Sequence, residues 1–201
     1  MDIHFSESEI KFEKELSSLD KFTIGFTDIL NRLSIKYVLV SGYVSILFGR
    51  NRASEDIDMF IEDLDFKRFQ LLWDELNKVF ECIITTDVNE AYDRYLTKCH
   101  ALRFSRKGKF IPNIELKFSK IDLDKWALDN RKMVVLNNHT LFISPLELQI
   151  SFKLYLGSEK DIEDARFLYN LFKENLDMPL LKEFNQKLKI GTITGTLMWF
   201  N

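Results

Sequence analysis

The sequence predicts an α/β protein in which helices pack on a mixed β-sheet of about five strands, with a helical C-terminal part. Short runs of β-branched and aliphatic residues, typical of strands, recur between segments with helical hydrophobic periodicity. The chain has 201 residues, of which 46% are hydrophobic, so it can bury a sizeable core. We expect a single domain over residues 1–201, with a core at about 36–143 and a helical part at about 144–201.

The N-terminal segment shows a helical pattern. Ser6-Glu7-Ser8-Glu9 has the form of a capping box, in which a serine and a glutamate three residues later satisfy backbone N–H groups at a helix start. Apolar residues then recur at helical spacing over 12–19 and again over 22–33. We expect two packing helices before the core.

Chemically useful side chains concentrate between residues 37 and 62. The apolar run Tyr37–Val40 predicts a buried strand, and Ser41-Gly42 stops it where a short helix can begin. A polar loop then leads into Asp56–Ile61, where acidic or aromatic residues alternate with aliphatic ones. The predicted order is strand, turn, helix, loop, strand.

The second of these strands carries two carboxylates on one face. Successive side chains of a strand point to opposite faces, so Asp56, Asp58 and Phe60 share one of them. Like charges held this close repel each other, and a cation between them relieves the repulsion. Their hard oxygen ligands suggest magnesium. The alternative is a half-exposed strand whose polar face happens to carry two aspartates.

The turn before the short helix has the form of a phosphate site. Small residues at a helix start, here Ser41 and Gly42, leave backbone N–H groups where a phosphate can lie. Arg50 and Arg52 add positive charge nearby. A phosphate cradle followed by a metal-holding carboxylate pair is what transfer of a nucleotidyl group requires.

The rest of the chain continues the alternation of helices and strands. Hydrophobic periodicity and turn residues predict the following elements: a helix at 65–80, a short strand at 82–86, a helix or ordered loop at 89–98, strands at 100–105 and 113–118, a helix at 122–130, a hairpin of 133–136 with 140–143, and helices starting at 144, 158 and 176.

Glu115 is the candidate third carboxylate. If strand 113–118 lies beside the strand of Asp58, Glu115 joins the acidic pair and can act as general base for an attacking hydroxyl. The alternative is a strand glutamate that pairs with Lys117 or another neighbour.

Two charged residues in the C-terminal part have two interpretations each. Lys153 lies in the apolar stripe of its helix, where a lysine usually extends to solvent but can also point into a cleft toward a phosphate. Asp161 either caps the helix that starts at Ser158 or orients Lys153.

These motifs resemble a known superfamily. Ser41-Gly42 followed by Arg52-Ala53-Ser54-Glu55-Asp56-Ile57-Asp58 resembles the polymerase-β-type nucleotidyltransferase signature, and within it the AbiEii-type group, whose toxins pair with antitoxins. The helix lysine after Ser144-Pro145 and the run Lys160–Asp164 are similar to later elements of that group. The resemblance covers roughly residues 37–171 and implies a nucleotidyltransferase-type sheet.

The resemblance also implies roles for individual residues. Asp56 and Asp58 would hold two Mg²⁺ ions, and Glu115 would contribute to a metal and activate the acceptor. The nucleoside triphosphate would contact Ser41, Gly42, Arg52, Ser54, Lys153 and Asp161.

The implied activity is transfer of a nucleoside monophosphate from an NTP to a hydroxyl acceptor. The acceptor is RNA, particularly tRNA, or a protein for a toxin-type enzyme, and an aminoglycoside-like small molecule for other members. A catalytically silent module that binds nucleotide or a partner is the other alternative. The net charge of −3 gives no bulk signal for nucleic acid. Two cysteines without metal-type spacing fit a cytoplasmic protein, and we expect no membrane segment.

Overall fold

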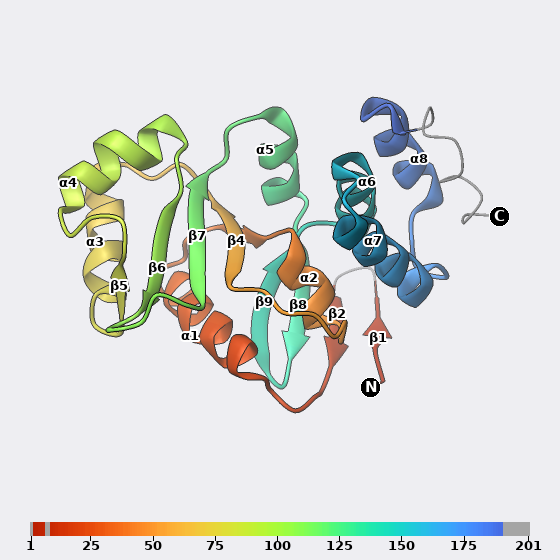
Figure 1. Cartoon of the computed structure of the whole chain (residues 1–201), viewed down its shortest axis with the longest axis horizontal. Helices are drawn as coiled ribbons and strands as arrows, with labels where there is room; N and C mark the ends of the chain where they lie inside the picture. Colours follow the sequence, from red (N-terminus) through yellow and green to blue (C-terminus); the bar gives the residue numbers. More distant parts are fainter. Residues whose placement is uncertain (1, 7–8, 191–201) are drawn as a thin grey trace.

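The computed structural model describes residues 2–6 and 9–190. Within these residues, nine strands form one mixed sheet in the order β1-β2-β8-β9-β3-β4-β7-β6-β5 (Figure 1). The strands are β1 His4–Phe5, β2 Glu9–Phe12, β3 Tyr37–Leu39, β4 Asp56–Ile61, β5 Phe80–Cys82, β6 Leu102–Arg106, β7 Asn113–Phe118, β8 Lys132–Leu136 and β9 His139–Ile143. The sheet is thus larger than the five strands expected, and the α/β fold class is confirmed.

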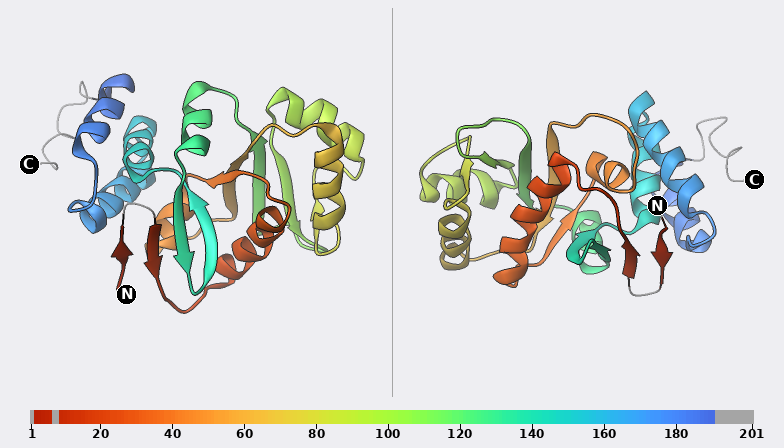
Figure 2. Two further views of the ribbon diagram at one scale, coloured as in Figure 1. Left: turned by 180° about the vertical axis from the view of Figure 1, so that it is seen from behind. Right: turned by 90° about the horizontal axis from the view of Figure 1, so that it is seen from below.

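The helices flank the sheet and form the C-terminal end of the molecule (Figures 1 and 2). They are α1 Ser18–Arg32, α2 Gly42–Leu47, α3 Phe66–Leu76, α4 Val88–Glu90, a π-turn at Ala91–Tyr95, a 3₁₀ turn at Leu96–Lys98, α5 Asp122–Asp129, α6 Leu146–Leu156, α7 Glu159–Phe172 and α8 Met178–Lys187. No helix in the described part of the chain is long and apolar enough to cross a membrane.

One face of the central sheet is covered by α1 and α3. The ring of Phe104 on β6 contacts Phe26 of α1 and Trp73 of α3. Phe104 is in register with Ile114 of β7, which in turn pairs with Ile57 of β4, so all three lie on this covered face. Because side chains alternate along a strand, Asp56, Asp58 and Glu115 lie on the opposite face.

The predicted first helix is wrong. Residues Glu9–Phe12 form β2, which pairs in parallel with β8, and their burial alternates with a period of two. Ile10 and Phe12 are buried, whereas Lys11 and Glu13 are exposed. This alternation is the pattern of a strand on a sheet. The Ser6 hydroxyl instead donates to the backbone carbonyl of Glu9 and accepts its N–H.

The helix predicted to start at residue 144 begins two residues later, at Leu146. Its N-cap is Pro145, and the hydroxyl of Ser144 donates to Gln149 Oε1 at 3.0 Å rather than capping the helix. Glu147 accepts the backbone N–H of Asp177 at the start of α8, at 2.8 Å. The predicted helix start at Ser158 is confirmed, since Ser158 is the N-cap of α7 and its side chain accepts from the N–H of Asp161. The single-domain boundary stays a prediction, and residues 1, 7–8 and 191–201 lie outside the described residues.

The N-terminus of α1 is fixed by a buried carboxylate. Asp20 is fully buried and forms the capping box with Ser17. It also accepts from the Tyr43 hydroxyl at 3.0 Å and pairs with Lys14 Nζ at 3.0 Å. Burial raises the pKa of Tyr43 well above its usual range, so this hydroxyl stays a donor. Asp20 therefore links α1 to the start of α2.

Asp20→Ala is expected to lower the free energy of unfolding by about 3 kcal/mol, because it leaves a buried hydroxyl and an ammonium group without their acceptor. Chemical denaturation would measure this loss. Lys21→Ala, at an exposed position of the same helix, is the matched control and should change stability by less than about 0.5 kcal/mol. Equal effects of the two substitutions would contradict the assignment.

Candidate active site

Three carboxylates meet on the open face of the sheet. Asp56 and Asp58 lie two residues apart on β4, and Asp58 is directly in register with Glu115 of the parallel strand β7. The predicted adjacency of these two strands is therefore confirmed. Asp56 is exposed, Asp58 is half-buried and Glu115 is 9% exposed. The acidic cluster is thus open toward the end of β4 at which Asp56 lies.

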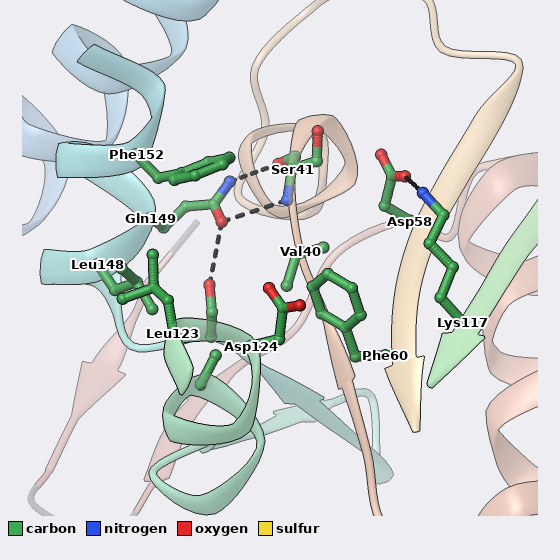
Figure 3. Close-up of a pocket in the computed structure, with 12 residues that line it drawn as sticks. Val40, Ser41, Asp58, Phe60, Lys117, Leu123, Asp124, Leu148, Gln149 and Phe152 are labelled. Atoms are coloured by element: carbon green, nitrogen blue, oxygen red, sulfur yellow. Dashed lines mark hydrogen bonds and ion pairs between the residues drawn. The ribbon is translucent and has the colours of Figure 1, made fainter. Parts of the chain in front are cut away.

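Two basic residues already contact this cluster. Lys117 Nζ lies 3.4 Å from Asp58 Oδ1 (Figure 3). It also lies 3.3 Å from Glu115 Oε2. Arg103, the register partner of Glu115 on β6, holds its Oε1 at 2.5 Å. The predicted alternative pairing of Glu115 with Lys117 is therefore present.

The pKa of Asp58 is raised above its ordinary value of 3.8. Burial is the largest cause, and the charges of Glu115 and Asp56 add to it, while Lys117 acts in the opposite direction. The ionised carboxylate is thus held in an environment that does not fully compensate its charge. An added cation would relieve this repulsion.

The donor set fits a magnesium ion at the two aspartates. Asp56 and Asp58 offer hard oxygen ligands on the open side, and a bound cation would offset the effect of burial and of the neighbouring acids that raises the pKa of Asp58. Glu115, by contrast, is engaged by Lys117 and Arg103. Among the described residues, no group of three or more acidic, histidine or cysteine side chains is arranged to hold a metal ion.

The turn after β3 lies beside these carboxylates. The N–H of Val40 donates to the backbone carbonyl of Asp58 at 3.1 Å, so the next residue, Ser41, begins the turn next to the acidic pair. Ser41 has φ 62° and ψ −138° and directly precedes α2, whose first residue is Gly42. The structure thus places the predicted phosphate cradle and carboxylate pair together.

Gln149 of α6 fixes the Ser41 peptide on both sides (Figure 3). Its Oε1 accepts the N–H of Ser41 at 3.2 Å, and its Nε2 donates to the carbonyl of Ser41 at 2.6 Å. The bond from Ser144 holds the same amide. Gln149 is 4% exposed, so these hydrogen bonds to Ser41 are shielded from water.

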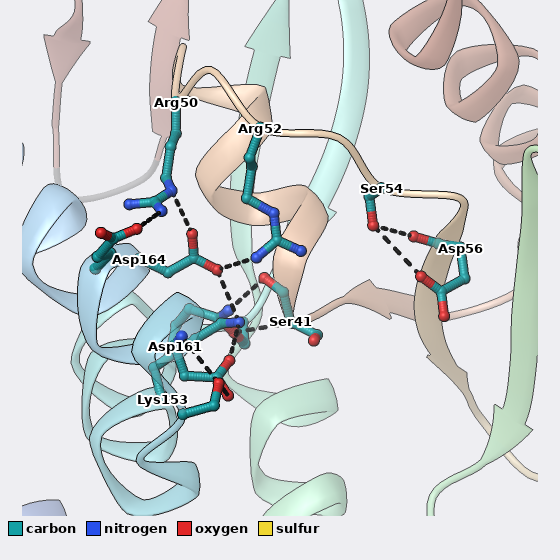
Figure 4. Close-up of polar contacts among 12 residues, drawn as sticks. Ser41, Arg50, Arg52, Ser54, Asp56, Lys153, Asp161 and Asp164 are labelled. Atoms are coloured by element: carbon teal, nitrogen blue, oxygen red, sulfur yellow. Dashed lines mark hydrogen bonds and ion pairs between the residues drawn. The ribbon is translucent and has the colours of Figure 1, made fainter.

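Behind the turn lies a buried ion-pair network (Figure 4). Asp164, which is fully buried, pairs with Arg50 Nε at 2.7 Å, Arg52 Nη1 at 2.7 Å and Lys153 Nζ at 2.9 Å. Asp161 Oδ1 lies 2.7 Å from the same ammonium group. Lys153 is therefore buried in this network and does not extend to solvent.

Asp161 contacts both Ser158 and Lys153, the partners in its two predicted roles. Its backbone N–H is capped by Ser158, and its carboxylate contacts Lys153. Burial alone would raise the pKa of Asp161, but hydrogen bonds from Lys153 and Ser158 outweigh it and hold the pKa below its usual range. Asp161 is therefore a stable anionic partner for Lys153.

Arg52 lies directly on Gly42. A Cβ added to Gly42 would lie 2.4 Å from Arg52 Nη2, so a larger residue here would displace the guanidinium from the start of α2. Ser54, farther along the same loop, donates to the backbone carbonyl of Asp56 at 3.0 Å. The loop thus brings one cation to the cradle and fixes the start of β4.

From the sequence, no role in this region was predicted for Arg103, Gln149 or Asp164, and Lys117 was named only as an alternative partner of Glu115. Two of them left a signal, because Gln149 and Asp164 are polar residues one position from the apolar stripes of their helices. Arg103 could be found only from strand register, which the sequence does not show.

Solved structures share this fold. An antigenic nucleotidyltransferase-like protein from Paracoccidioides brasiliensis has a TM-score of 0.53 at 18% identity, over 88% of this chain and 90% of that chain. The antibiotic-resistance factor ANT(2'')-Ia has a TM-score of 0.54 at 9% identity, over 86% and 93%. Its complex with adenylyl-2''-tobramycin has a TM-score of 0.51 at 11% identity, over 81% and 94%.

The chain has a nucleotidyltransferase fold. The fold class predicted from the sequence is therefore confirmed by these likenesses. No protein-family model matches the sequence, and no match to a curated protein was found. The AbiEii-type resemblance, the magnesium ions and the roles of the site residues stay predictions.

Asp164→Asn should lower the free energy of unfolding by about 3 kcal/mol or more. The reason is that the three cations paired with Asp164 would then face a neutral amide. Chemical denaturation would measure this loss. Glu163→Gln is the matched control, since the side chain of Glu163 is 53% exposed and contacts the same Arg50. Its effect should stay below about 1 kcal/mol. A small effect of Asp164→Asn would mean that the network is not held by this carboxylate.

Asp58→Asn should raise the thermal midpoint at pH 7. The pKa of Asp58 is raised in the folded state, so stability is lost as the pH rises from the unfolded value of 3.8 through the folded-state pKa. The gain from the substitution should therefore shrink as the pH falls toward 4. Thermal unfolding at both pH values would measure it, with the exposed Asp63→Asn as control. A gain that is equal at both pH values would contradict the electrostatic cause.

Proposed function

We propose that this protein is a magnesium-dependent nucleotidyltransferase that moves a nucleoside monophosphate from an NTP to a hydroxyl acceptor. The observation that carries the proposal is the placement of Asp56 and Asp58 beside the Ser41 turn, with Glu115 in register with Asp58. The nucleotidyltransferase fold, shared with the structures described above, supports it.

The carboxylates divide the chemistry between them. Asp56 and Asp58 would hold magnesium, which supplies Lewis-acid stabilisation of the charge that develops on the phosphate oxygens. The acceptor oxygen forms a bond to the α-phosphorus, and the bond from that phosphorus to the β-phosphate oxygen breaks, releasing pyrophosphate. Glu115 takes the proton of the acceptor hydroxyl. Arg103 and Lys117 hold Glu115 in place for this step.

The turn and the ion-pair network provide the phosphate site. Ser41 and Gly42 present the start of α2 to the triphosphate, and the guanidinium of Arg52 lies over this position. Lys153 adds a second cation whose orientation is set by Asp161. Preorganised positive groups of this kind stabilise the transferred charge without reorganising during the reaction.

Ser54 has a structural part in this proposal. Its hydroxyl also lies 3.4 Å from Asp56 Oδ1, so it orients one of the two metal-holding carboxylates.

Two different likenesses favour two different acceptors. The AbiEii-type motifs favour a toxin-type enzyme that modifies tRNA or a protein and is neutralised by an antitoxin. The fold shared with ANT(2'')-Ia in complex with adenylyl-2''-tobramycin favours a small hydroxyl compound such as an aminoglycoside. We propose the toxin-type acceptor first, because it rests on motifs of this chain, and a cytoplasmic location, which the two free cysteines fit.

The test is incubation of the purified protein with each α-³²P-labelled NTP, Mg²⁺, and total RNA, cell extract or tobramycin. Asp58→Asn and Asp56→Asn should each abolish transfer while the fold stays intact by circular dichroism, because each removes one magnesium-holding carboxylate. Label transferred by the wild type alone would support the enzyme, and the labelled species would identify the acceptor. Full turnover by both variants would overturn the mechanism. Magnesium-dependent nucleotide binding without transfer would indicate the catalytically silent module.

A further inference from the structure

A cavity of about 210 Å³ opens beside Asp58 and the Ser41 turn (Figure 3). It lies between the sheet, α5 and α6, and most of its wall is apolar. The apolar wall is formed mainly by Val40, Phe60, Leu123, Leu148 and Phe152. None of the residues that the mechanism uses as phosphate-binding cations lines it.

Two aromatic rings bound the cavity from different elements. Phe60 belongs to β4, two residues after Asp58, and Phe152 belongs to α6, three residues after Gln149. In Figure 3 their side chains lie on opposite sides of the cavity. Phe152 is 38% exposed, so its ring is available at the opening. A flat heterocycle is the kind of group that such walls bind by stacking.

One wall carries a carboxylate with a fixed orientation. Asp124 Oδ2 accepts the backbone N–H groups of Lys120 and Ile121, at 3.0 Å and 3.1 Å, at the start of α5. Among the described residues, none donates a hydrogen bond to its other oxygen, Oδ1. Asp124 lines the cavity, so its carboxylate is an acceptor held in place there.

The remaining acidic residue of the wall, Asp58, belongs to the reaction centre. An acceptor molecule with several ammonium groups would need more carboxylates than this apolar cavity offers. A planar base with a single donor group matches it better. The cavity also adjoins both the phosphate cradle and the carboxylate at which the α-phosphate would react, and the base of an NTP is joined to that phosphate through the ribose.

We propose that this cavity binds the base of the nucleoside triphosphate and that Asp124 selects bases with an exocyclic amino group. The proposal rests on the proposed nucleotidyl transfer and names its donor class. A carboxylate oxygen accepts from the amino group of cytosine or adenine. The corresponding group of uracil is a carbonyl oxygen, which the carboxylate repels. CTP and UTP share the pyrimidine frame and differ at this group and at N3, which is an acceptor in cytosine and an N–H donor in uracil, and are therefore the probes.

The test is isothermal titration calorimetry of CTP and of UTP, each with Mg²⁺, on the full chain. The wild type should bind CTP at least about 10-fold more tightly than UTP, the effect of one polar group against the wrong base. Asp124→Asn keeps an oxygen for the N–H groups of Lys120 and Ile121 but turns an amide donor toward the cavity. It should reduce the CTP to UTP preference at least about 10-fold. Asp122→Asn, on the exposed side of α5, should leave the preference unchanged.

A second variant tests the stacking wall separately. Phe152→Ala should weaken the binding of CTP and the binding of UTP by the same factor, about 10-fold, because stacking does not discriminate between the two bases. Leu156→Ala, an exposed position of the same helix, is its control.

The outcomes separate the two proposals. Equal binding of CTP and UTP by the wild type, or an unchanged preference in folded Asp124→Asn, overturns the base site and leaves nucleotidyl transfer standing. Weakened tobramycin binding in Asp124→Asn with unchanged CTP binding also overturns it, because the cavity would then hold the acceptor. Binding of no NTP by the wild type overturns the proposed function itself.

Discussion

Asp164 is fully buried and pairs with Arg50, Arg52 and Lys153, so a single carboxylate joins the loop before β4 to helices α6 and α7. Three cations around one acid would be unstable without further negative charge, which Asp161 supplies. The pairing fixes the path of the loop, and with it the position of Arg52. The proposed phosphate cradle is therefore shaped by residues more than 100 positions away in the sequence.

The carboxylate cluster has the opposite character, because its charges are only partly compensated. Burial and neighbouring acids raise the pKa of Asp58, and Lys117 offsets part of this effect while also contacting Glu115. Lys117 thus stabilises the cluster in the absence of a metal but leaves the exposed Asp56 open to a further cation. The folded chain gives up some stability at neutral pH to keep these acids together, as functional sites often do.

The elements with the strongest local patterns were predicted closely. The limits of β4 and β7, Asp56–Ile61 and Asn113–Phe118, agree with the prediction because two-residue alternation and turn residues define them. The N-terminal strand β2 was predicted as a helix, since Ser6 and Glu9 also match a capping box and only pairing with β8 decides between the two. Local patterns located the acids Asp56, Asp58 and Glu115. Their partners depend on strand register and helix packing, which act across the chain and leave little local signal.

Helix α6 shows why the site depends on packing as well as on motifs. Three side chains of α6 make different contacts. Gln149 bonds the backbone of Ser41, Phe152 lines the cavity and Lys153 belongs to the ion-pair network. The helix carries its polar contacts on the same buried side as its apolar ones, so it has no clear amphipathic face. A shift of α6 would therefore change the cradle, the cavity and the cations together. Because Asp164 ties α6 to the loop before β4, the geometry of the phosphate site and that of the cavity are set by the same contacts.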